Sequence, residues 1–358
     1  MRSRSGKTTP NSAHKFCSPP YATFKSVFFG LAVARVMHKQ VRGVNMLKIR
    51  KFVQGRDEEA WLRITNEAFK EYDDFRPDTM EDMELYEKSP NFDTTGMFIA
   101  EWNSAPIGMV NAYVDKKREE KKGFIRSLGI IPEFRRKGIG RTLANKAIDS
   151  LKARGMESVE AWAREDKVAC RSLYESMGFK RIRVFSTMRR NLEGLPYDIG
   201  EHKGVRIRPM KTNLDDIKLL TWLENEAFKE HFNFRPRTIE ETRYWVENKP
   251  WCDIVGLFFT YLDGKPVGYV GAGIDSEFIK HSGVRRGWIM TIGVLKPQRR
   301  RGIGTTLMLC GMEFLKTKGM TEVELGVDDT NPTRAIDLYK KAGFKITRKE
   351  LTYLRRLD

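Results

Sequence analysis

The sequence predicts an α/β protein built from two tandem copies of one domain, in which helices cover a sheet. Its 358 residues exceed what a single hydrophobic core usually holds, so two domains are expected. A set of short motifs recurs at an interval close to 160 residues. Around these motifs, segments with strand and helix patterns follow one another in the same order, which is typical of a sheet with helices on both faces.

The recurring motifs place the two copies in register. Asn-Glu-Ala-Phe-Lys-Glu stands at 66–71 and again, unchanged, at 225–230. Arg-Arg-Lys-Gly-Ile-Gly at 135–140 recurs with one substitution as Arg-Arg-Arg-Gly-Ile-Gly at 299–304. The interval grows only from 159 to 165 residues along the chain, so small loop insertions explain the drift. A period of this length indicates a duplicated domain rather than a solenoid of short repeats.

Each copy begins with a short strand followed by two helices. The strands are expected at 47–53 and 205–208. The first helix carries the Asn-Glu-Ala-Phe-Lys-Glu motif. The second helix begins at a capping box, in which a threonine is followed three residues later by an acid, at Thr79 in one copy and Thr238 in the other.

A hairpin, another strand, a basic glycine loop and a long helix follow in each copy. The hairpin strands are expected at 97–102, 107–114, 257–262 and 267–274. The long helices after the loops carry apolar residues at helical spacing. A further strand, a short helix and a final strand then close each copy. We therefore expect a first domain at 46–191, a linker rich in glycine at 192–204, and a second domain at 205–358.

The first 45 residues differ in composition from the rest of the chain. Residues 1–45 hold eight Lys or Arg and no acid, so they supply +8 of the net charge of +18. This basic extension reads as a disordered tail or an over-long translation start, and a transit peptide is a third interpretation. The basic body suits an anionic ligand such as a nucleotide cofactor, or an acidic macromolecular partner, and charge alone does not choose between them.

The composition is that of a soluble globular protein, with 40% hydrophobic and 31% charged residues. No apolar run approaches the roughly 20 residues that span a bilayer, so no membrane partner is expected. The four cysteines lie far apart without a C-x-x-C pair, and the five histidines form no metal-ligand spacing. We therefore expect no metal site and a reducing, cytoplasmic location.

The basic loops carry the strongest chemical signal. In the first copy a strand ends at Pro132, and a loop with three cations and two glycines runs directly into a helix. Helix N-termini leave N–H groups unpaired and favour phosphate, and glycines let the backbone approach it closely. A Walker loop is excluded because Arg141 and Thr305 follow the last glycine, and a Rossmann fingerprint because Leu143 and Leu307 stand where it needs glycine.

The Arg-x-x-Gly-x-Gly loop after a strand resembles the pyrophosphate-binding motif of the GNAT superfamily of N-acetyltransferases. The resemblance covers roughly residues 46–358 and implies two tandem acyl-CoA N-acyltransferase domains, each a mixed, mostly antiparallel sheet flanked by helices. It implies acetyl-CoA as the cofactor, gripped by the loop and paired with the backbone of the preceding strand. The implied cofactor-binding residues are Leu128, Gly129, Ile130, Arg135, Arg136, Lys137, Gly138, Ile139, Gly140, Ile292, Gly293, Val294, Arg299, Arg300, Arg301, Gly302, Ile303, Gly304 and Asn331.

A second signature of the same family is a helix bearing a tyrosine and followed by Gly-Phe. Tyr174 and Tyr339 match it, and the resemblance implies that such a tyrosine protonates the departing CoA thiolate. Asn331 matches an asparagine that holds the cofactor, but Asp166 stands there in the first copy and cannot donate a hydrogen bond. We therefore expect the C-terminal domain to carry the chemistry. Both tyrosines also fit an apolar helix face, so a packing role stays open.

The acceptor amine must attack in its neutral form. An α-amine with a pKa of about 7.7–8 reaches this form far more readily at pH 7 than a lysine side chain with a pKa of about 10.4. The strands before the loops offer Arg126 and Met290 at the relevant depth, not acids. Glu160 and Glu324 on the following strands are candidate bases, and each also fits a solvated strand residue. His231 is expected at the rim or surface.

These observations predict an acetyl-CoA-dependent N-acetyltransferase that acts by direct attack in a ternary complex. The acceptor is a small molecule or a peptide α-amine, and the oligomeric state is left open. A non-catalytic acyl-CoA sensor is the alternative. A nucleic-acid partner ranks third, because the basic residues gather at the loops and the extension without interleaved aromatic side chains.

Overall fold

The computed structural model describes residues 46–195, 204–249 and 252–357. The predicted extension at 1–45 and most of the predicted linker at 192–204 lie outside these residues. The chain divides into two compact units, Met1–Met46 and Leu47–Asp358, and the fold described is that of the second. No helix among the described residues is long and apolar enough to cross a membrane.

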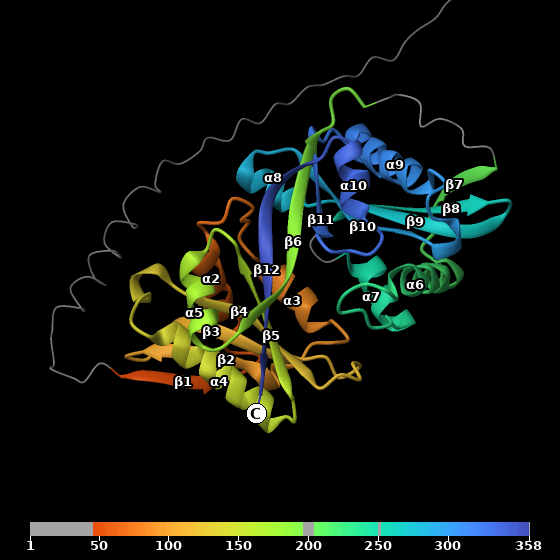
Figure 1. Cartoon of the computed structure of the whole chain (residues 1–358). Coiled ribbons are helices and arrows are strands. Elements are labelled where there is room, and N and C mark those ends of the chain that lie inside the picture. The colour runs from red at the N-terminus through yellow and green to blue at the C-terminus, as the bar shows by residue number, and fades with distance from the viewer. Residues whose placement is uncertain (1–45, 196–203, 250–251, 358) are drawn as a thin grey trace, which may run out of the picture. The chain divides into compact units, whose positions relative to one another are not determined.

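The described residues of the second unit form one 12-stranded sheet with the order β1-β2-β3-β4-β5-β12-β6-β11-β10-β9-β8-β7 (Figure 1). Only the β4–β5 and β10–β11 pairs are parallel, so the predicted mixed, mostly antiparallel sheet is confirmed. The strands are β1 (Leu47–Lys51), β2 (Met97–Trp102), β3 (Ala105–Val114), β4 (Lys122–Ile130), β5 (Ser158–Arg164), β6 (Lys180–Asn191), β7 (Val205–Pro209), β8 (Ile254–Leu262), β9 (Lys265–Ile274), β10 (Arg286–Val294), β11 (Glu322–Asp328) and β12 (Lys345–Arg356).

The last strands of the two copies are exchanged. β6 ends the first copy but pairs with β11 of the second, and β12 ends the second copy but pairs with β5 of the first. The two exchanged strands also pair with each other and run side by side through the middle of the sheet (Figure 1). The expectation that the final strand closes its own copy is therefore wrong. The physical reason is that both strands present the same pattern of buried residues, so either fits either position.

Helices pack on both faces of each half-sheet, as predicted. In the first copy Leu143 of α4 lies against Gly108 of β3, while Thr65 of α2 bonds the sulfur of the next residue, Met109. Because neighbouring strand residues point to opposite faces, α2 and α4 cover opposite faces. The helices are α2 (Glu58–Phe69), α3 (Met80–Glu87), α4 (Ile139–Ala153), α5 (Val168–Ser176), α6 (Leu214–Phe228), α7 (Ile239–Asn248), α8 (Ser276–Ser282), α9 (Ile303–Thr317) and α10 (Ala335–Lys341).

Two arginines hold one copy against the other, and both come from a Phe-Arg-Pro segment that recurs at 75–77 and 234–236. Arg76 bonds both oxygens of Asp82 and reaches across to Asp275, at 2.8 Å, in the second copy. Arg235 reaches Asp115 of the first copy at 2.6 Å in the same manner. Both arginines are largely buried and fully engaged in these ion pairs, so they hold the copies together rather than face a ligand.

The exchange predicts that the two copies unfold together. β6 has both of its strand neighbours in the second copy, so neither half-sheet is complete without the other. In differential scanning calorimetry we expect one transition, with calorimetric and van't Hoff enthalpies that agree. Replacing Arg76→Ala should cost about 3 kcal/mol and lower that single transition without splitting it. Two resolved transitions would show that the copies are independent.

Candidate active site

A fork opens in the sheet where β10 and β11 separate. Their pairing covers Arg286 to Trp288 against Glu322 to Glu324, whereas β10 continues to Val294. Because β10 bonds β9 on its other side, its edge beyond Trp288 presents backbone N–H and C=O groups to the fork. A register shift at Met290 bulges the strand at the point of separation. A cavity of about 1900 Å³ fills the fork.

The predicted strand residues lie on this free edge. Ile292, Gly293 and Val294 all line the cavity. A side chain at Gly293 would lie 2.6 Å from Tyr269 and 2.9 Å from Ala227, so glycine is required for α6 to pack closely against β10. The equivalent residues of the first copy, 128–130, end β4 in the same way.

The N-terminus of α9 borders the same cavity. Its N-cap residue, Gly302, has a left-handed backbone (φ 81°) and no side chain to cap the helix. The first N–H groups of α9 therefore remain available to an anion. Arg300 is exposed and lines the cavity together with Gly302 and Gly304. Ile303 is buried in the core, so it can contribute its backbone alone to a ligand.

The first arginine of each loop is turned into the protein. Arg299 donates to the carbonyl oxygens of Val294 at 3.0 Å and Ala227 at 2.9 Å, and it pairs with Glu230 at 3.1 Å. Arg135 makes the same three kinds of contact in the first copy. These bonds fix the second loop against the end of α6 and the first loop against the end of α2. Arg299 thereby shapes the loop, and it lines the cavity together with the exposed Arg300.

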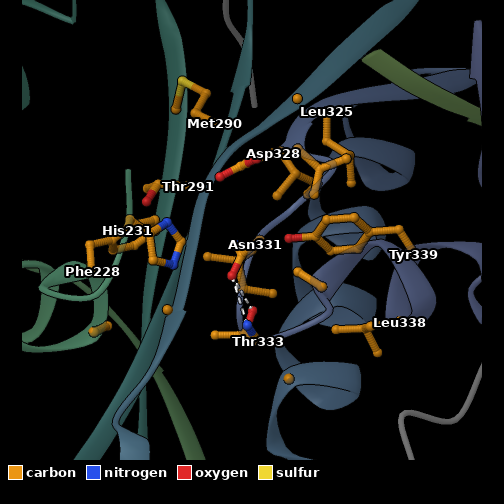
Figure 2. A pocket seen from close by; sticks show the side chains of 18 of the residues that line it. Phe228, His231, Met290, Thr291, Leu325, Asp328, Asn331, Thr333, Leu338 and Tyr339 are labelled. Carbon is orange, nitrogen blue, oxygen red and sulfur yellow. Dashed lines mark hydrogen bonds between the residues drawn. The ribbon is translucent and has the colours of Figure 1, made fainter. Parts of the chain in front are cut away.

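Tyr339 and Asn331 lie on the opposite side of the fork, on α10 and the loop before it. Figure 2 shows the Tyr339 hydroxyl pointing into the cavity, toward Asn331 and the His231 side. The Asn331 side-chain oxygen accepts bonds from the backbone N–H and the hydroxyl of Thr333, at 2.9 and 2.8 Å. These bonds leave the amide nitrogen as a donor for a ligand. Burial raises the pKa of Tyr339 to about 12, so its hydroxyl stays protonated.

In the first copy ion pairs bridge the equivalent fork. Arg164, at the end of β5, pairs with Asp73 at 2.8 Å and Asp74 at 3.1 Å in the loop after α2. Asp166, which replaces the asparagine, pairs with Arg164 as well, at 3.1 Å. Although partial burial opposes it, bonding to Arg164 and Lys167 holds the pKa of Asp166 below its usual value.

The other first-copy residues of the predicted site have internal partners or face solvent. Tyr174 is buried beside Cys170, and burial raises its pKa well above the usual value. The ammonium of Lys137 lies over the rings of Trp102 and Phe134, at 5.4 and 4.9 Å. Arg136 and Gly138 are exposed, and Gly140 is half-buried. Ile139 is a core residue, like its counterpart Ile303 in the second copy. Arg301 of the second copy is exposed.

Side chains also fill the inner end of the first fork. The Arg126 guanidinium lies 4.0 Å from the centre of the Tyr113 ring and 5.8 Å from that of Trp162, which stacks on Phe124. The register of the second copy places Gly273, Met290 and Gly326 at the positions of Tyr113, Arg126 and Trp162. A side chain added at Gly326 would meet no atom within 4 Å. The second fork is therefore wider.

Two regions of the chain, 59–179 and 218–344, match the model of the Acetyltransferase (GNAT) family. Together they cover more than half of the chain. The chain belongs to the GNAT family. The predicted recognition of a tandem GNAT protein is confirmed, and the predicted enzyme class, an acyltransferase of the N-acetyltransferase type, is that of the family, whose members use acyl-CoA.

Curated relatives of this GNAT protein include two named mycothiol acetyltransferase. The one from Thermobispora bispora is 32% identical over 184 residues, which are 48% of this chain and 62% of the relative. The one from Actinosynnema mirum is 27% identical over 244 residues, 68% of this chain and 78% of the relative. The chain thus spans less than two thirds of the first of these relatives.

Solved structures of similar fold include two GNAT proteins. A GCN5-related N-acetyltransferase from Sphaerobacter thermophilus has a TM-score of 0.62 at 21% identity and covers 87% of this chain and 95% of its own. A tandem GNAT protein from the clavulanic acid biosynthesis pathway has a TM-score of 0.68 at 16% identity and covers 87% of this chain and 98% of its own. At these identities the likeness shows the fold alone.

The structure changes the view of the candidate bases. Glu160 and Glu324 are both buried, so the interpretation as solvated strand residues is wrong. Glu324 pairs with Arg189 at 2.8 Å, and Glu160 accepts two bonds from Asn233. His231, expected at the rim or surface, lines the cavity in the fork between β10 and β11. The sequence signal that could have located it is its position directly after the repeated Asn-Glu-Ala-Phe-Lys-Glu motif, where the first copy has Tyr72.

Proposed function

We propose that this protein transfers the acetyl group of acetyl-CoA to a small primary amine, and that the reaction takes place in the fork of the C-terminal GNAT domain. The observation that carries the proposal is the contrast between the two forks. The second holds a cavity of about 1900 Å³, whereas Arg126, Tyr113 and Trp162 fill the inner end of the first. In this reading the first domain is a scaffold that completes the sheet of the second.

The fit of acyl-CoA to the second fork rests on two unsatisfied backbone surfaces. The uncapped N-terminus of α9, with Arg300 beside it, would hold the diphosphate. The free edge of β10 would pair with the amide-bearing arm of the donor, in the manner of an added strand. The Asn331 amide is the side-chain donor on the far side of the fork. When bound, the donor supplies a thioester whose carbonyl carbon an amine can attack.

The residues around the fork would then act mainly by positioning. Holding both reactants in place can replace an effective concentration of about 10⁵–10⁸ M. The neutral amine attacks the carbonyl carbon, the carbon–sulfur bond breaks, and the hydroxyl of Tyr339 gives its proton to the departing sulfur. Burial raises the pKa of Tyr339 to about 12 and so keeps this phenol protonated, in the form that can give a proton to the sulfur.

The proposal for the acceptor is a small amine of low basicity. Two curated relatives are named mycothiol acetyltransferase, and a fungal glucosamine N-acetyltransferase region has a similar fold. The test uses the full chain, acetyl-CoA and three probes: glucosamine, the α-amine of glycylglycine, and the side chain of Nα-blocked lysine. Thiol release and product mass are measured. We expect turnover with at least one of the first two and a lower rate with lysine. Acetyl-CoA binding without turnover of any probe would favour a sensor.

We also expect one acetyl-CoA per chain. Arg300 and Arg136 are matched loop cations with the same backbone conformation (φ 66° and 63°), one in each copy. Losing one charged contact to a phosphate should weaken acetyl-CoA binding about tenfold, equivalent to about 1.4 kcal/mol. Isothermal titration calorimetry should therefore give a stoichiometry near one and a weaker Kd for Arg300→Ala. Arg136→Ala should leave the Kd unchanged, and a stoichiometry near two would overturn the scaffold role.

A further inference from the structure

We propose that the imidazole of His231 is the general base that takes the proton from the acceptor amine in the C-terminal fork. This inference rests on the proposed function, since it assigns a residue to the same reaction. It depends on where His231 lies, on which groups face it, and on the absence of a better-placed base among the described residues of the fork.

An acceptor that arrives as an ammonium ion needs a base, and the strands of the fork do not supply one. β10 presents Trp288 and Met290 to the cavity at the point where the strands separate. On β11, Glu324 is held between arginines, at 2.8 Å from Arg189, 3.6 Å from Arg286 and 3.8 Å from Arg348. The Glu324 carboxylate is therefore engaged by three arginines and is not free to approach an acceptor amine.

Five other carboxyl groups line the cavity, those of Glu224, Asp275, Asp328, Asp337 and Glu350. Each pairs with an arginine: Arg237 at 2.9 Å, Arg76 at 2.8 Å, Arg183 at 2.7 Å, Arg334 at 2.7 Å and Arg348 at 3.7 Å, in the same order. His231 differs from all of these acids, because among the described residues its ring makes no ion pair and packs on the Phe228 ring instead.

His231 occupies a position that a base for this reaction would need. It lies three residues after the end of α6, and the tilted Phe228 ring, with its centre 4.4 Å away, holds the imidazole against the helix end. Figure 2 shows it across the fork from Tyr339, with Asn331 between the two in this view. A proton acceptor and a proton donor thus face the fork from opposite sides.

His231 also stands between two cavities. A second cavity of about 370 Å³ lies under the loop after α6 and extends to Asp115 of the first copy. It shares four lining residues with the large cavity, namely Glu224, Phe228, His231 and Arg237. The His231 side chain therefore borders both cavities.

Burial and two nearby arginines keep the imidazole neutral. Burial lowers the pKa of His231 below its usual value of about 6.5, and Arg299 and Arg183 add to this effect. Asp328 and Glu230 oppose it without reversing it. These four groups come from the loop after β10, from β6, from β11 and from the end of α6. The ring is consequently unprotonated, and able to accept a proton, at pH 7.

The proposed step conserves protons and electron pairs. A ring nitrogen of His231 takes one proton from the ammonium group of the acceptor. The freed electron pair of the amine forms the new C–N bond to the carbonyl carbon, and the C–S bond breaks with its electrons on sulfur. Tyr339 protonates that sulfur, and the second ammonium proton leaves with solvent. The product amide and the free thiol are neutral at the reacting atoms.

The test compares the full chain with His231→Gln, which keeps a polar side chain but cannot accept the proton. With the best probe of the amine screen, kcat/KM should fall about 10²-fold, within the range of 10²–10⁴ usual for general bases. The Kd for acetyl-CoA should stay within about twofold, because the contacts to the donor are unchanged. In the wild type kcat/KM should decline below pH 6.5 as the base is protonated, and this acid limb should disappear in the variant. Added imidazole should restore part of the rate.

The matched control is His281→Gln, which changes a histidine that packs on Phe75 outside the cavity and should keep full activity. If His231→Gln retains more than half of the wild-type kcat/KM, or if its acid limb is unchanged, the assignment is wrong. If the wild type acetylates none of the probes, the proposed function fails instead. A pH titration of the His231 ring protons by NMR then still tests whether the ring is neutral at pH 7.

Discussion

The substitution Gly326→Trp should abolish most of the activity while leaving the protein folded. It gives the second copy the residue that the first copy has at this place, because Trp162 of β5 holds the register position equivalent to Gly326 of β11. No atom lies within 4 Å of a Cβ placed at Gly326, which lines the cavity, so a side chain begun there starts in open space. There it would fill the space in which the proposed reactants meet. We expect kcat/KM to fall at least about 100-fold and the melting temperature to change by less than about 4 °C.

The control for this substitution is Gly326→Ala. An alanine methyl fits the same open space but does not reach across the fork, so kcat/KM should stay within about threefold of the wild type. Glycine in a strand interior also costs conformational entropy, so the alanine variant should be at least as stable as the wild type. A tryptophan variant that keeps its activity would show that the wider fork is not where the acceptor binds.

The repeat, the order of the elements and the family were predictable because they depend on local patterns. The capping boxes at Thr79 and Thr238, for example, begin α3 and α7 as expected. The strand exchange was not predictable from such patterns. β6 and β12 have identical sequences of exposed, half-buried and buried positions, so the alternation of side chains specifies a strand in that place but not which copy supplies it.

Parts of the candidate site depend on partners that are distant in the sequence. A basic loop predicts an anion site, but the direction of each guanidinium depends on whether a carbonyl or a carboxylate lies nearby. Arg299 bonds the carbonyl oxygen of Ala227 and the carboxylate of Glu230, some 70 residues earlier, whereas Arg300 is exposed at the cavity. In the same way the sequence shows an arginine at 126, but it does not predict that the guanidinium lies over the ring of Tyr113.

The substitution Tyr339→Phe should slow the chemical step without weakening the binding of acetyl-CoA. If the hydroxyl protonates the departing sulfur, its loss removes an interaction made in the transition state and not in the ground state. We expect kcat to fall about 10²-fold, with the Kd for acetyl-CoA within about twofold of the wild type. Because burial raises the pKa of Tyr339 to about 12, the wild-type hydroxyl stays a donor up to at least pH 10, and no alkaline loss of activity should come from this residue.

The duplicated chain supplies the matched control for this experiment. Tyr174 occupies the equivalent helix position, is equally buried and is followed by the same Gly-Phe pair, but its fork is bridged by Arg164 and filled by Trp162. Tyr174→Phe should therefore leave kcat within about twofold of the wild type. Equal losses in both variants would mean that the tyrosines act through packing, and a loss in Tyr174→Phe alone would move the reaction to the first copy. Only a large loss confined to Tyr339→Phe agrees with proton transfer in the C-terminal fork.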